Sequence, residues 1–438
     1  MKILMNSILK ALTILIVSLS VSLSAIAEPP VMEGYPPSRE SQATMKNYLE
    51  YPFNQWTFRN IGAPLNVVMI PREGNIYNFS GPDMPSLAEY QVTDIKNKTM
   101  ELETLFAENH TDGLVVIKGD KLLYENYFNG FNEHAQHIWF SMSKSLASTA
   151  FGLLVQDKKV DLSASPSKYI PELEGSGFDR VTLQHVLDMA SSIDFKESYT
   201  DFSSDFAVHY VPALNMGWLP GAGDVQPEST EIYGVHDFLA KFIKPDLKRE
   251  PGDNLDYNSS NADLIGWLIS RISGQPFQDY IQKNIWSKLG AEHDAYIAVD
   301  RAFMPVVTGG MNSTTRDAAR FAMMIRDRGN FNGQQIIPAN WIDETLNISQ
   351  RLRKNMSDNL IYSEEPWTSY HNMWWVIDEK KGEFCAMGIH GQVMYINRST
   401  DTVMVWFSSQ PVAGNPRNVN TQSKLKAAKQ LSTYLGSN

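Results

Sequence analysis

Two groups of strand-like segments, far apart in the chain, most constrain its fold. The early group is a pair of alternating apolar runs over residues 114–127, joined at the turn Lys118-Gly119-Asp120-Lys121, and it predicts a β-hairpin. The later group comprises residues 374–377, 391–397 and 402–407, which have the β-branched and aromatic composition of strands. We expect both groups to form one antiparallel sheet, with helical residues from the middle of the chain over one end.

The remaining sequence predicts the other parts of the chain. Residues 28–100 are rich in Pro, Asn and aromatic residues without a sustained period, and we expect a surface arm there. Residues 101–165 and 301–438 would form the α/β sheet domain, and residues 166–300, where Pro and Gly separate helical pieces, a helical domain. The single Cys385 closes no internal disulfide, so packing of a chain that is 43% hydrophobic must stabilise the fold.

The first 27 residues have the features of a secretory leader. Lys2 and Lys10 precede an apolar stretch, and Ala25-Ile26-Ala27 is a small-x-small cleavage site. We expect cleavage after Ala27 and a periplasmic or secreted protein, with an uncleaved anchor as the alternative. The apolar stretch is short for a membrane anchor. The net charge of −11 makes nucleic acid an unsuitable partner.

Ser141 and Lys144 have the spacing of an activated nucleophile. Three residues apart on a helix, the ε-amine can take the proton of the hydroxyl. Only this pair opens a long apolar helix after an extended run, here residues 137–140. The alternative is that Ser141 is an ordinary helix N-cap. The Ser-x-x-Lys pattern occurs four times, at Ser7/Lys10, Ser141/Lys144, Ser165/Lys168 and Ser423/Lys426.

Tyr257 is the candidate second proton carrier. It follows the turn Pro251-Gly252-Asp253 and precedes a helical stretch that starts near Ala262, so its side chain can project into a cleft. Beside a lysine ammonium group we expect its phenolate form to become accessible. The alternative is a half-buried tyrosine that holds the turn.

A third candidate element is the sequence Gly388-Ile389-His390-Gly391 at a strand edge. Its glycines allow a substrate to approach backbone N–H groups, one of which could form an oxyanion hole with the N–H of Ser141. Glycines of a plain bulge are the competing interpretation. His390 could act as a general base or line a wall. His134 and His137 lack a third ligand nearby, and no phosphate loop or dinucleotide fingerprint is found, so we expect neither a metal nor a cofactor.

Taken in this order, the three elements resemble those of the serine β-lactamase and penicillin-binding (DD-peptidase) superfamily. Residues 160–173, 181–192 and 309–317 also look like landmarks of that superfamily, and the resemblance spans roughly residues 110–410. Within it the chain is most similar to the class C-related esterases and amidases, and in particular to the 6-aminohexanoate-dimer (nylon-oligomer) hydrolases. The closer similarity is carried by Ser141-Met142-Ser143-Lys144-Ser145, Tyr257-Asn258-Ser259 and Gly388-Ile389-His390-Gly391-Gln392.

The resemblance implies both a fold and roles for individual residues. The fold would be α/β, with an antiparallel sheet flanked by helices, an all-helical domain and the active site between them. Ser141 would be the nucleophile, Lys144 its base and Tyr257 the second proton carrier, while the N–H groups of Ser141 and Ile389 would form the oxyanion hole. The residues implied in substrate binding are Ser259, Gly388 and His390.

Two departures from the family pattern bear on the substrate. Ser259 stands where the second motif, Tyr-x-Asn, usually has Asn, which weakens a hydrogen bond to an acylamino side chain. Ala386-Met387-Gly388 replaces a Lys-Thr-Gly type triplet, so the cation that would meet a substrate carboxylate is missing, although His390 or an arginine from elsewhere could compensate. Both departures argue against β-lactams and peptidyl-D-alanine as preferred substrates.

We therefore expect an exported serine hydrolase that cleaves a small-molecule amide or ester through an acyl-enzyme. A DD-peptidase or β-lactamase acting on cell-wall peptides or β-lactams is the alternative with the same fold. A relative that binds a ligand without catalysis is a third interpretation, which the presence of Ser141, Lys144 and Tyr257 together disfavours.

Overall fold

The computed structural model describes residues 31–81, 84–217, 219–221, 232–363, 366–414 and 418–437, and the leader predicted for residues 1–27 lies outside them. The chain forms two compact units, Met1–Gln42 and Ala43–Asn438. In the described part of the first unit, the backbone N–H of Met32 donates to the Ser41 carbonyl at 2.8 Å, and a short 3-10 helix η1 spans Arg39–Ser41. All the elements that follow belong to the second unit.

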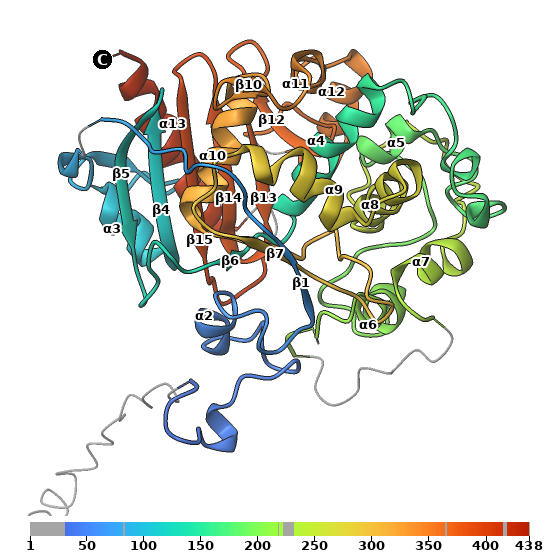
Figure 1. The fold of residues 1–438 in the computed structure, drawn as a ribbon, viewed down its shortest axis with the longest axis horizontal. Helices are drawn as coiled ribbons and strands as arrows, with labels where there is room; N and C mark the ends of the chain where they lie inside the picture. Colours follow the sequence, from blue (N-terminus) through green and yellow to red (C-terminus); the bar gives the residue numbers. More distant parts are fainter. Residues whose placement is uncertain are drawn as a thin grey trace, which may run out of the picture. The chain divides into compact units, whose positions relative to one another are not determined.

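A seven-stranded antiparallel sheet is the centre of the second unit (Figure 1). The early and the later group of strands meet in its interior, because β15 pairs with β4, with Leu114 opposite Trp406. The predicted antiparallel sheet is therefore confirmed, with two strands, β11 and β13, added to those expected. The strands in spatial order are β11 (Ser369–His371), β12 (Trp374–Asp378), β13 (Glu383–Gly388), β14 (Gln392–Asn397), β15 (Thr402–Ser408), β4 (Thr111–Lys118) and β5 (Lys121–Tyr127).

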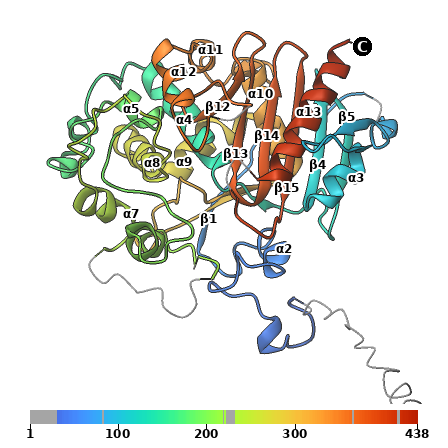
Figure 2. The same cartoon turned by 180° about the vertical axis from the view of Figure 1, so that it is seen from behind.

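Helices cover both faces of this sheet, as its buried strands require. On one face lie α4 (Met142–Gln156) and α10 (Thr315–Arg326), and on the other α3 (Leu102–Glu108) and α13 (Val419–Ser437). Figure 1 shows α10 in front of the strands, and Figure 2, seen from behind, shows α13 in front of them. Every residue of β14 and β15 is buried, so these two strands form the middle of the core.

Helices and loops of the middle of the chain pack beside α4. The largest of them, α8 (Ser260–Ser273), lies directly against α4. Around it are α5 (Leu183–Leu187), the π-helical turns η5 (Phe206–Tyr210) and η6 (Phe238–Phe242), α6 (Val211–Leu214), α7 (Val235–Asp237) and α9 (Phe277–Asn284).

Four short strands form a second sheet that the sequence did not predict. Its order is β1 (Val67–Ile70), β7 (Ala295–Ala298), β8 (Met311–Ser313) and β6 (His137–Ile138). β1 lies in the segment expected to be a surface arm, and β7 lies in the segment expected to be helical. Strands of two to four residues are too short to show a period of two, so their pairing becomes visible only in three dimensions.

The remaining elements are short. They are α2 (Phe53–Thr57), η2 (Pro85–Leu87), β2 (Gln91–Thr93), β3 (Thr99–Glu101), η3 (Pro166–Lys168), η4 (Pro171–Leu173), η7 (Trp286–Lys288), β9 (Asn330–Phe331), β10 (Gln334–Gln335), α11 (Ala339–Thr345), α12 (Gln350–Ser357) and η8 (Ile389–Gly391). Within the described ranges, none of the helices combines the length and the apolar character needed to cross a bilayer.

Candidate active site

A tight turn between β6 and α4 places Ser141 at the start of a buried helix. The turn passes through Phe140, whose φ of 46° is unusual for a residue with a side chain. Phe58 packs edge-on against the Phe140 ring, with 5.0 Å between the ring centroids. A non-glycine residue held in this conformation by its surroundings is typical of functional sites, where it fixes the direction of the next side chain.

The Ser141 hydroxyl interacts with Lys144 and does not cap its helix. Ser141 occupies the N-cap position of α4, yet its side chain makes no capping hydrogen bond. Instead, Lys144 Nζ lies 2.6 Å from Ser141 Oγ and also donates to the Thr308 carbonyl at 3.0 Å. The alternative of an ordinary N-cap therefore does not describe Ser141. By contrast, Ser165 does cap its turn η3 by accepting from the N–H of Ser167.

Burial gives Lys144 the character of a base. Its side chain is almost entirely buried, which lowers the pKa of the ammonium group to about 8, while the carboxylates of Glu197 and Asp263 act in the opposite direction. A lysine with this pKa is neutral in a useful fraction of molecules at physiological pH. It can therefore accept the proton of Ser141 when the hydroxyl attacks.

Tyr257 reaches the same point from the loop before α8. The N–H of Asp256 donates to the Met189 carbonyl at 2.7 Å, and the Asn258 side chain donates to the Phe195 carbonyl at 3.0 Å, so residues on both sides of Tyr257 are held. The Tyr257 ring stacks on Trp375, with 5.6 Å between centroids and 20° between planes.

The polar end of Tyr257 completes the proton-transfer group. Its hydroxyl forms a hydrogen bond with Ser141, and Lys144 Nζ lies 5.3 Å from its ring centroid. Burial and the nearby Glu197 raise the pKa of the phenol well above its usual value. The expectation of an accessible phenolate is therefore wrong, because burial and the Glu197 carboxylate outweigh the hydrogen bond with Ser141. A protonated phenol is suited to donating a hydrogen bond or a proton.

Gly388 brings the end of β13 against the nucleophile turn. A Cβ at this position would lie 2.3 Å from the Trp139 carbonyl oxygen and 3.0 Å from the Phe140 Cβ, so only glycine allows the two backbones to approach this closely. Gly388 and Ile389 line the same cavity as Ser141. The close approach explains the glycine better than a plain bulge does.

The other two residues implied in substrate binding lie outside the cavity lining. Ser259 is buried at the start of α8, where its backbone N–H donates to the Glu197 carboxylate at 2.7 Å. His390 is fully buried, packs against Phe58 and Phe140, and Nδ1 lies 2.6 Å from the Gln410 carbonyl oxygen. Burial lowers the pKa of His390 to about 4, so it cannot replace the missing cation. The predicted substrate contacts of His390 and Ser259 are corrected accordingly, because both residues are buried and neither lines the cavity.

Ser141 opens into a cavity of about 850 Å³, within the range of small-molecule sites. Aromatic rings form much of its wall, and Trp375 is one of them. Of the lining residues that the structure describes, Lys196 alone is a lysine or arginine, while Glu197 and Asp256 are acidic. The aromatic residues of the lining are Tyr199, Tyr257, Tyr362 and Trp375.

Several residues of the site were not predicted from the sequence. Glu197 accepts a hydrogen bond from the Tyr199 hydroxyl at 2.6 Å and lies beside the catalytic group. Asp263 lies on α8, six residues after Tyr257. The sequence could have indicated Asp263 more readily than Glu197, because a charged residue in an apolar helical stretch is unusual. Thr308 precedes Gly309-Gly310, which begin one of the family landmarks. It accepts from Lys144 through its backbone carbonyl, and any residue type has this group, so the sequence could not indicate the contact.

His134 and His137, which were considered as metal ligands, do not contact each other. His137 is buried, lies 3.2 Å from the Asp112 carboxylate and stacks on Phe407, whereas His134 is exposed and contacts His293. Over the described ranges of the chain, no group of three or more His, Cys, Asp or Glu side chains has the arrangement of a metal site.

A serine paired with a buried lysine and a phenol, at the mouth of a cavity between an antiparallel sheet and helices, defines a serine hydrolase. The Beta-lactamase family model matches residues 102–429, and the chain belongs to this family. The expected superfamily, fold and enzyme class are thereby confirmed.

Within this family, the chain is similar to two proteins named as 6-aminohexanoate-dimer hydrolases and shares the fold of a carboxylesterase. The chain is 30% identical over 378 residues to the 6-aminohexanoate-dimer hydrolase of Paenarthrobacter ureafaciens, covering 86% of this chain and 91% of that protein. A Bacillus anthracis structure provisionally named a 6-aminohexanoate-dimer hydrolase superimposes with a TM-score of 0.78 at 25% identity, covering 92% and 99% of the two chains. A family VIII carboxylesterase shares the fold, with a TM-score of 0.54, 14% identity and coverage of 80% and 99%.

Proposed function

We propose that this enzyme hydrolyses a small amide or ester through an acyl-enzyme formed on Ser141. The observation that carries the proposal is the 2.6 Å contact between Lys144 Nζ and Ser141 Oγ at the mouth of the large cavity. Similarity to 6-aminohexanoate-dimer hydrolases over most of both chains supports an amide as substrate, and the shared carboxylesterase fold is compatible with esters.

The geometry supports the following sequence of steps. Ser141 Oγ attacks the substrate carbonyl while neutral Lys144 takes its proton, and the backbone N–H groups of Ser141 and Ile389 stabilise the oxyanion. Tyr257 then passes its proton to the leaving nitrogen or oxygen and is reprotonated from Lys144. The carbonyl bond to the leaving group breaks, which leaves an ester on Ser141. Water then attacks this ester while Lys144 takes one of its protons. The bond between the acyl carbon and Ser141 Oγ breaks, the proton passes from Lys144 to Oγ, and the acid is released.

The charges of the cavity indicate which acyl groups fit. Ala386 is buried within β13, and His390 is neutral and enclosed, so neither offers a cation at the position of the family's Lys-Thr-Gly triplet. The described lining contains two carboxylates, Glu197 and Asp256, and one amine, Lys196. Asp256 is paired with Arg249 at 3.0 Å, whereas Glu197 forms no salt bridge to a lysine or arginine within the described part of the chain. We therefore propose neutral or amine-bearing substrates over those with a carboxylate next to the scissile bond.

A substitution at Ser141 tests the nucleophile. We expect Ser141→Ala to abolish both covalent labelling by a fluorophosphonate probe and turnover of a short-chain nitrophenyl ester. Ser143→Ala is the matched control, because Ser143 lies on the same helix and its hydroxyl accepts from the Met311 N–H instead of facing the cavity. Ester turnover by Ser141→Ala at the wild-type rate would overturn the proposal.

The DD-peptidase or β-lactamase alternative has its own test. A panel with linear 6-aminohexanoate dimer, nitrophenyl esters, a peptidyl-D-alanine peptide and a fluorescent penicillin separates the two. We expect turnover of the amide or ester and no stable capture of penicillin. Covalent capture of penicillin by Ser141 with no amide turnover would favour the cell-wall function. Absence of reaction with every compound would favour the non-catalytic relative.

We also propose that the protein is exported by a leader of residues 1–27. The charged start, the apolar stretch and Ala25-Ile26-Ala27 support this proposal. When the full chain is expressed in a bacterium with a periplasm, mass spectrometry of the periplasmic fraction should find Glu28 as the first residue. Retention of the whole chain, Met1 included, in the cytoplasm would contradict export.

A further inference from the structure

A buried carboxylate lies behind the proposed catalytic base. Asp263 projects from α8 and is almost entirely enclosed. One of its oxygens accepts from the Thr308 N–H at 2.9 Å, and the other accepts from the Tyr210 hydroxyl at 2.5 Å. An ionisable group is costly to bury unless it is satisfied in this way, so a carboxylate here calls for an explanation.

Thr308 links this carboxylate to Lys144. The same residue that donates its N–H to Asp263 accepts from Lys144 Nζ through its carbonyl at 3.0 Å. Because both backbone groups of Thr308 are engaged, its orientation is fixed from two sides. A hydrogen-bonded path therefore runs from Tyr210 through Asp263 and Thr308 to Lys144, and from there to Ser141.

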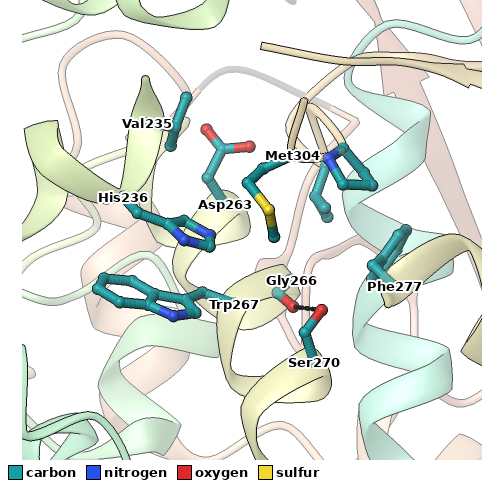
Figure 3. Close-up of a pocket in the computed structure, with 10 residues that line it drawn as sticks. Val235, His236, Asp263, Gly266, Trp267, Ser270, Phe277 and Met304 are labelled. Carbon is teal, nitrogen blue, oxygen red and sulfur yellow. Dashed lines mark hydrogen bonds between the residues drawn. The ribbon is translucent and has the colours of Figure 1, made fainter. Parts of the chain in front are cut away.

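Among the described residues, no lysine or arginine lines the small cavity beside Asp263. This cavity, of about 10 Å³, is shown in Figure 3, where the ring of His236 lies over that of Trp267. The two rings stack 4.1 Å apart, and burial lowers the pKa of His236 to about 4, so this histidine is neutral at physiological pH. The other residues that line this small cavity carry no charge.

The charged groups around Asp263 and Lys144 are few. Burial raises the pKa of Asp263 to about 7, and the carboxylate of Asp300 acts in the same direction, whereas Tyr210, Thr308 and Lys144 lower it. Lys144 in turn faces Glu197 on the cavity side. Burial and the carboxylate of Asp263 keep the pKa of Tyr210 well above its usual value, so that it remains a donor.

We propose that Asp263 is a positioning residue of this hydrolase, which holds Lys144 against Ser141 through Thr308 and whose charge sets the pH at which Lys144 becomes a base. The inference rests on the proposed role of Lys144 as the base. It assigns a role to a residue that lies outside the three recognised motifs and contacts no part of the substrate cavity.

The sign of the effect follows from the charges. A negative carboxylate favours the ammonium form of Lys144, so the intact protein needs a higher pH to produce the neutral amine. Removing that charge lowers the pKa of Lys144. The acid limb of kcat/KM, which rises as Lys144 loses its proton, should then move to lower pH.

Asp263→Asn tests the inference with little change in shape. The amide oxygen can still accept from Thr308, so the variant mainly removes the charge. With a nitrophenyl ester, we expect the acid limb of kcat/KM to move down by about one pH unit, as is typical on loss of a nearby opposite charge. The rate of fluorophosphonate labelling of Ser141 should shift with pH in the same way. A limb at the wild-type pH, accompanied only by a lower Tm, would overturn the inference.

Tyr210→Phe provides a second test if Asp263→Asn does not fold. Loss of the hydroxyl raises the pKa of Asp263, so the carboxylate is charged in fewer molecules and Lys144 becomes a base at lower pH. We expect a smaller shift of the acid limb in the same direction. An unchanged limb in this variant would also overturn the inference.

Asp300→Asn is the matched control. Asp300 is another buried carboxylate, yet it accepts from the backbone N–H groups of Val235, Ala302 and Met304 and makes no contact with Thr308 in the described structure. Removing the Asp300 charge lowers the pKa of Asp263 and leaves that carboxylate charged in more molecules. We therefore expect a lower Tm and no shift of the acid limb to lower pH, and a shift to lower pH equal to that of Asp263→Asn would overturn the specific role of Asp263. A wild-type protein without any ester turnover or labelling would instead contradict the proposed function itself.

Discussion

Lys144 owes its chemistry to its surroundings more than to its motif. The ammonium group is enclosed between Ser141 Oγ at 2.6 Å and the Thr308 carbonyl at 3.0 Å, and burial lowers its pKa to about 8. At a pH equal to this pKa, a lysine in water would be protonated in nearly every molecule. The protein thus makes a base by removing solvent from an ordinary side chain.

The wild-type pH profile should report this base. In the proposed mechanism neutral Lys144 accepts the proton of Ser141, so kcat/KM should rise with pH and approach a plateau above about pH 8. Measurement of kcat/KM from pH 5.5 to 9.5 with a neutral ester, whose own charge is constant, checks this. A profile that is flat from pH 6 upward would exclude Lys144 as the titrating base.

Tyr257→Phe separates proton donation from packing. The phenylalanine ring keeps the stacking on Trp375, so KM should change little, while loss of the hydroxyl should lower kcat roughly 100-fold. The effect should be larger for amides than for nitrophenyl esters, because nitrophenolate leaves without a proton. Steady-state kinetics on both substrates, with Tyr362→Phe as the control on a neighbouring ring, checks the prediction.

The sequence could predict the residues whose spacing is local. Ser141 and Lys144 lie one helical turn apart, so a pattern of four letters already implies their contact. Glu197 and Asp263 act on Lys144 from distant parts of the chain. The packing of α8 on α4 brings Asp263 near, and the N–H of Ser259 at the start of α8 holds the Glu197 carboxylate. The state of Tyr257 was predicted incorrectly for the same reason, since its burial depends on Trp375 and Tyr370, which lie more than a hundred residues later.

At the scale of elements, the junction of β13 with the turn before α4 decides whether the site is assembled. β13 carries Met387 and Gly388 into the cavity wall, and Gly388 touches the backbone of the turn at Trp139. β14 then holds β13 in register through the pair of Gly388 with Gln392. The nucleophile and the proposed oxyanion hole are thus positioned by direct backbone packing.

Gly388→Ala should disrupt this junction. The added methyl would lie 2.3 Å from the Trp139 carbonyl oxygen, a distance that forces the strand and the turn apart. We expect kcat to fall by 100-fold or more while KM changes less, as is typical when an oxyanion donor is displaced. Gly62→Ala is a suitable control, because its added methyl would meet only Val67, at an ordinary 3.6 Å. Full activity of Gly388→Ala would show that the close approach is not required.

Elements with clear patterns were predictable and short ones were not. The hairpin of β4 and β5 and the strands β12, β14 and β15 appeared in the sequence as apolar runs of sufficient length. β13 was recognised only as an edge near glycines, because Glu383 at its start and Gly388 at its end interrupt the apolar pattern. β1 and β7 acquire their strand form from pairing with each other, which no local pattern encodes.

At the scale of the whole molecule, α13 closes the back of the sheet with a buried lysine. Lys424 Nζ donates to Ser408 Oγ at 2.6 Å and lies 6.0 Å from the Phe106 ring centroid. Burial lowers its pKa to about 7 in the folded protein, whereas the unfolded chain has the ordinary value near 10.4. Between these two values the unfolded chain binds a proton that the folded protein does not.

Lys424→Met should therefore change how stability depends on pH. In the wild type, Lys424 makes the free energy of unfolding rise between about pH 7 and pH 10, by up to about 1.4 kcal/mol per pH unit for one proton. Below about pH 7 this contribution is constant, since both states are protonated. Urea unfolding at pH 6, 7, 8 and 9 should show a smaller rise in the variant. Lys426→Met, on the same helix and less buried, should retain the wild-type rise.

The pairing of β4 with β15 also determines when the sheet can be completed during synthesis. Leu114 leaves the ribosome about 290 residues before its partner Trp406, a delay of roughly 15–60 s at ordinary elongation rates. During most of that interval β4 has only β5 beside it, and the strand that carries Gly388 is synthesised only shortly before Trp406. We expect every nascent chain that stops before β15 to be inactive, because hydrolysis requires β15 to be paired with β4 in the sheet.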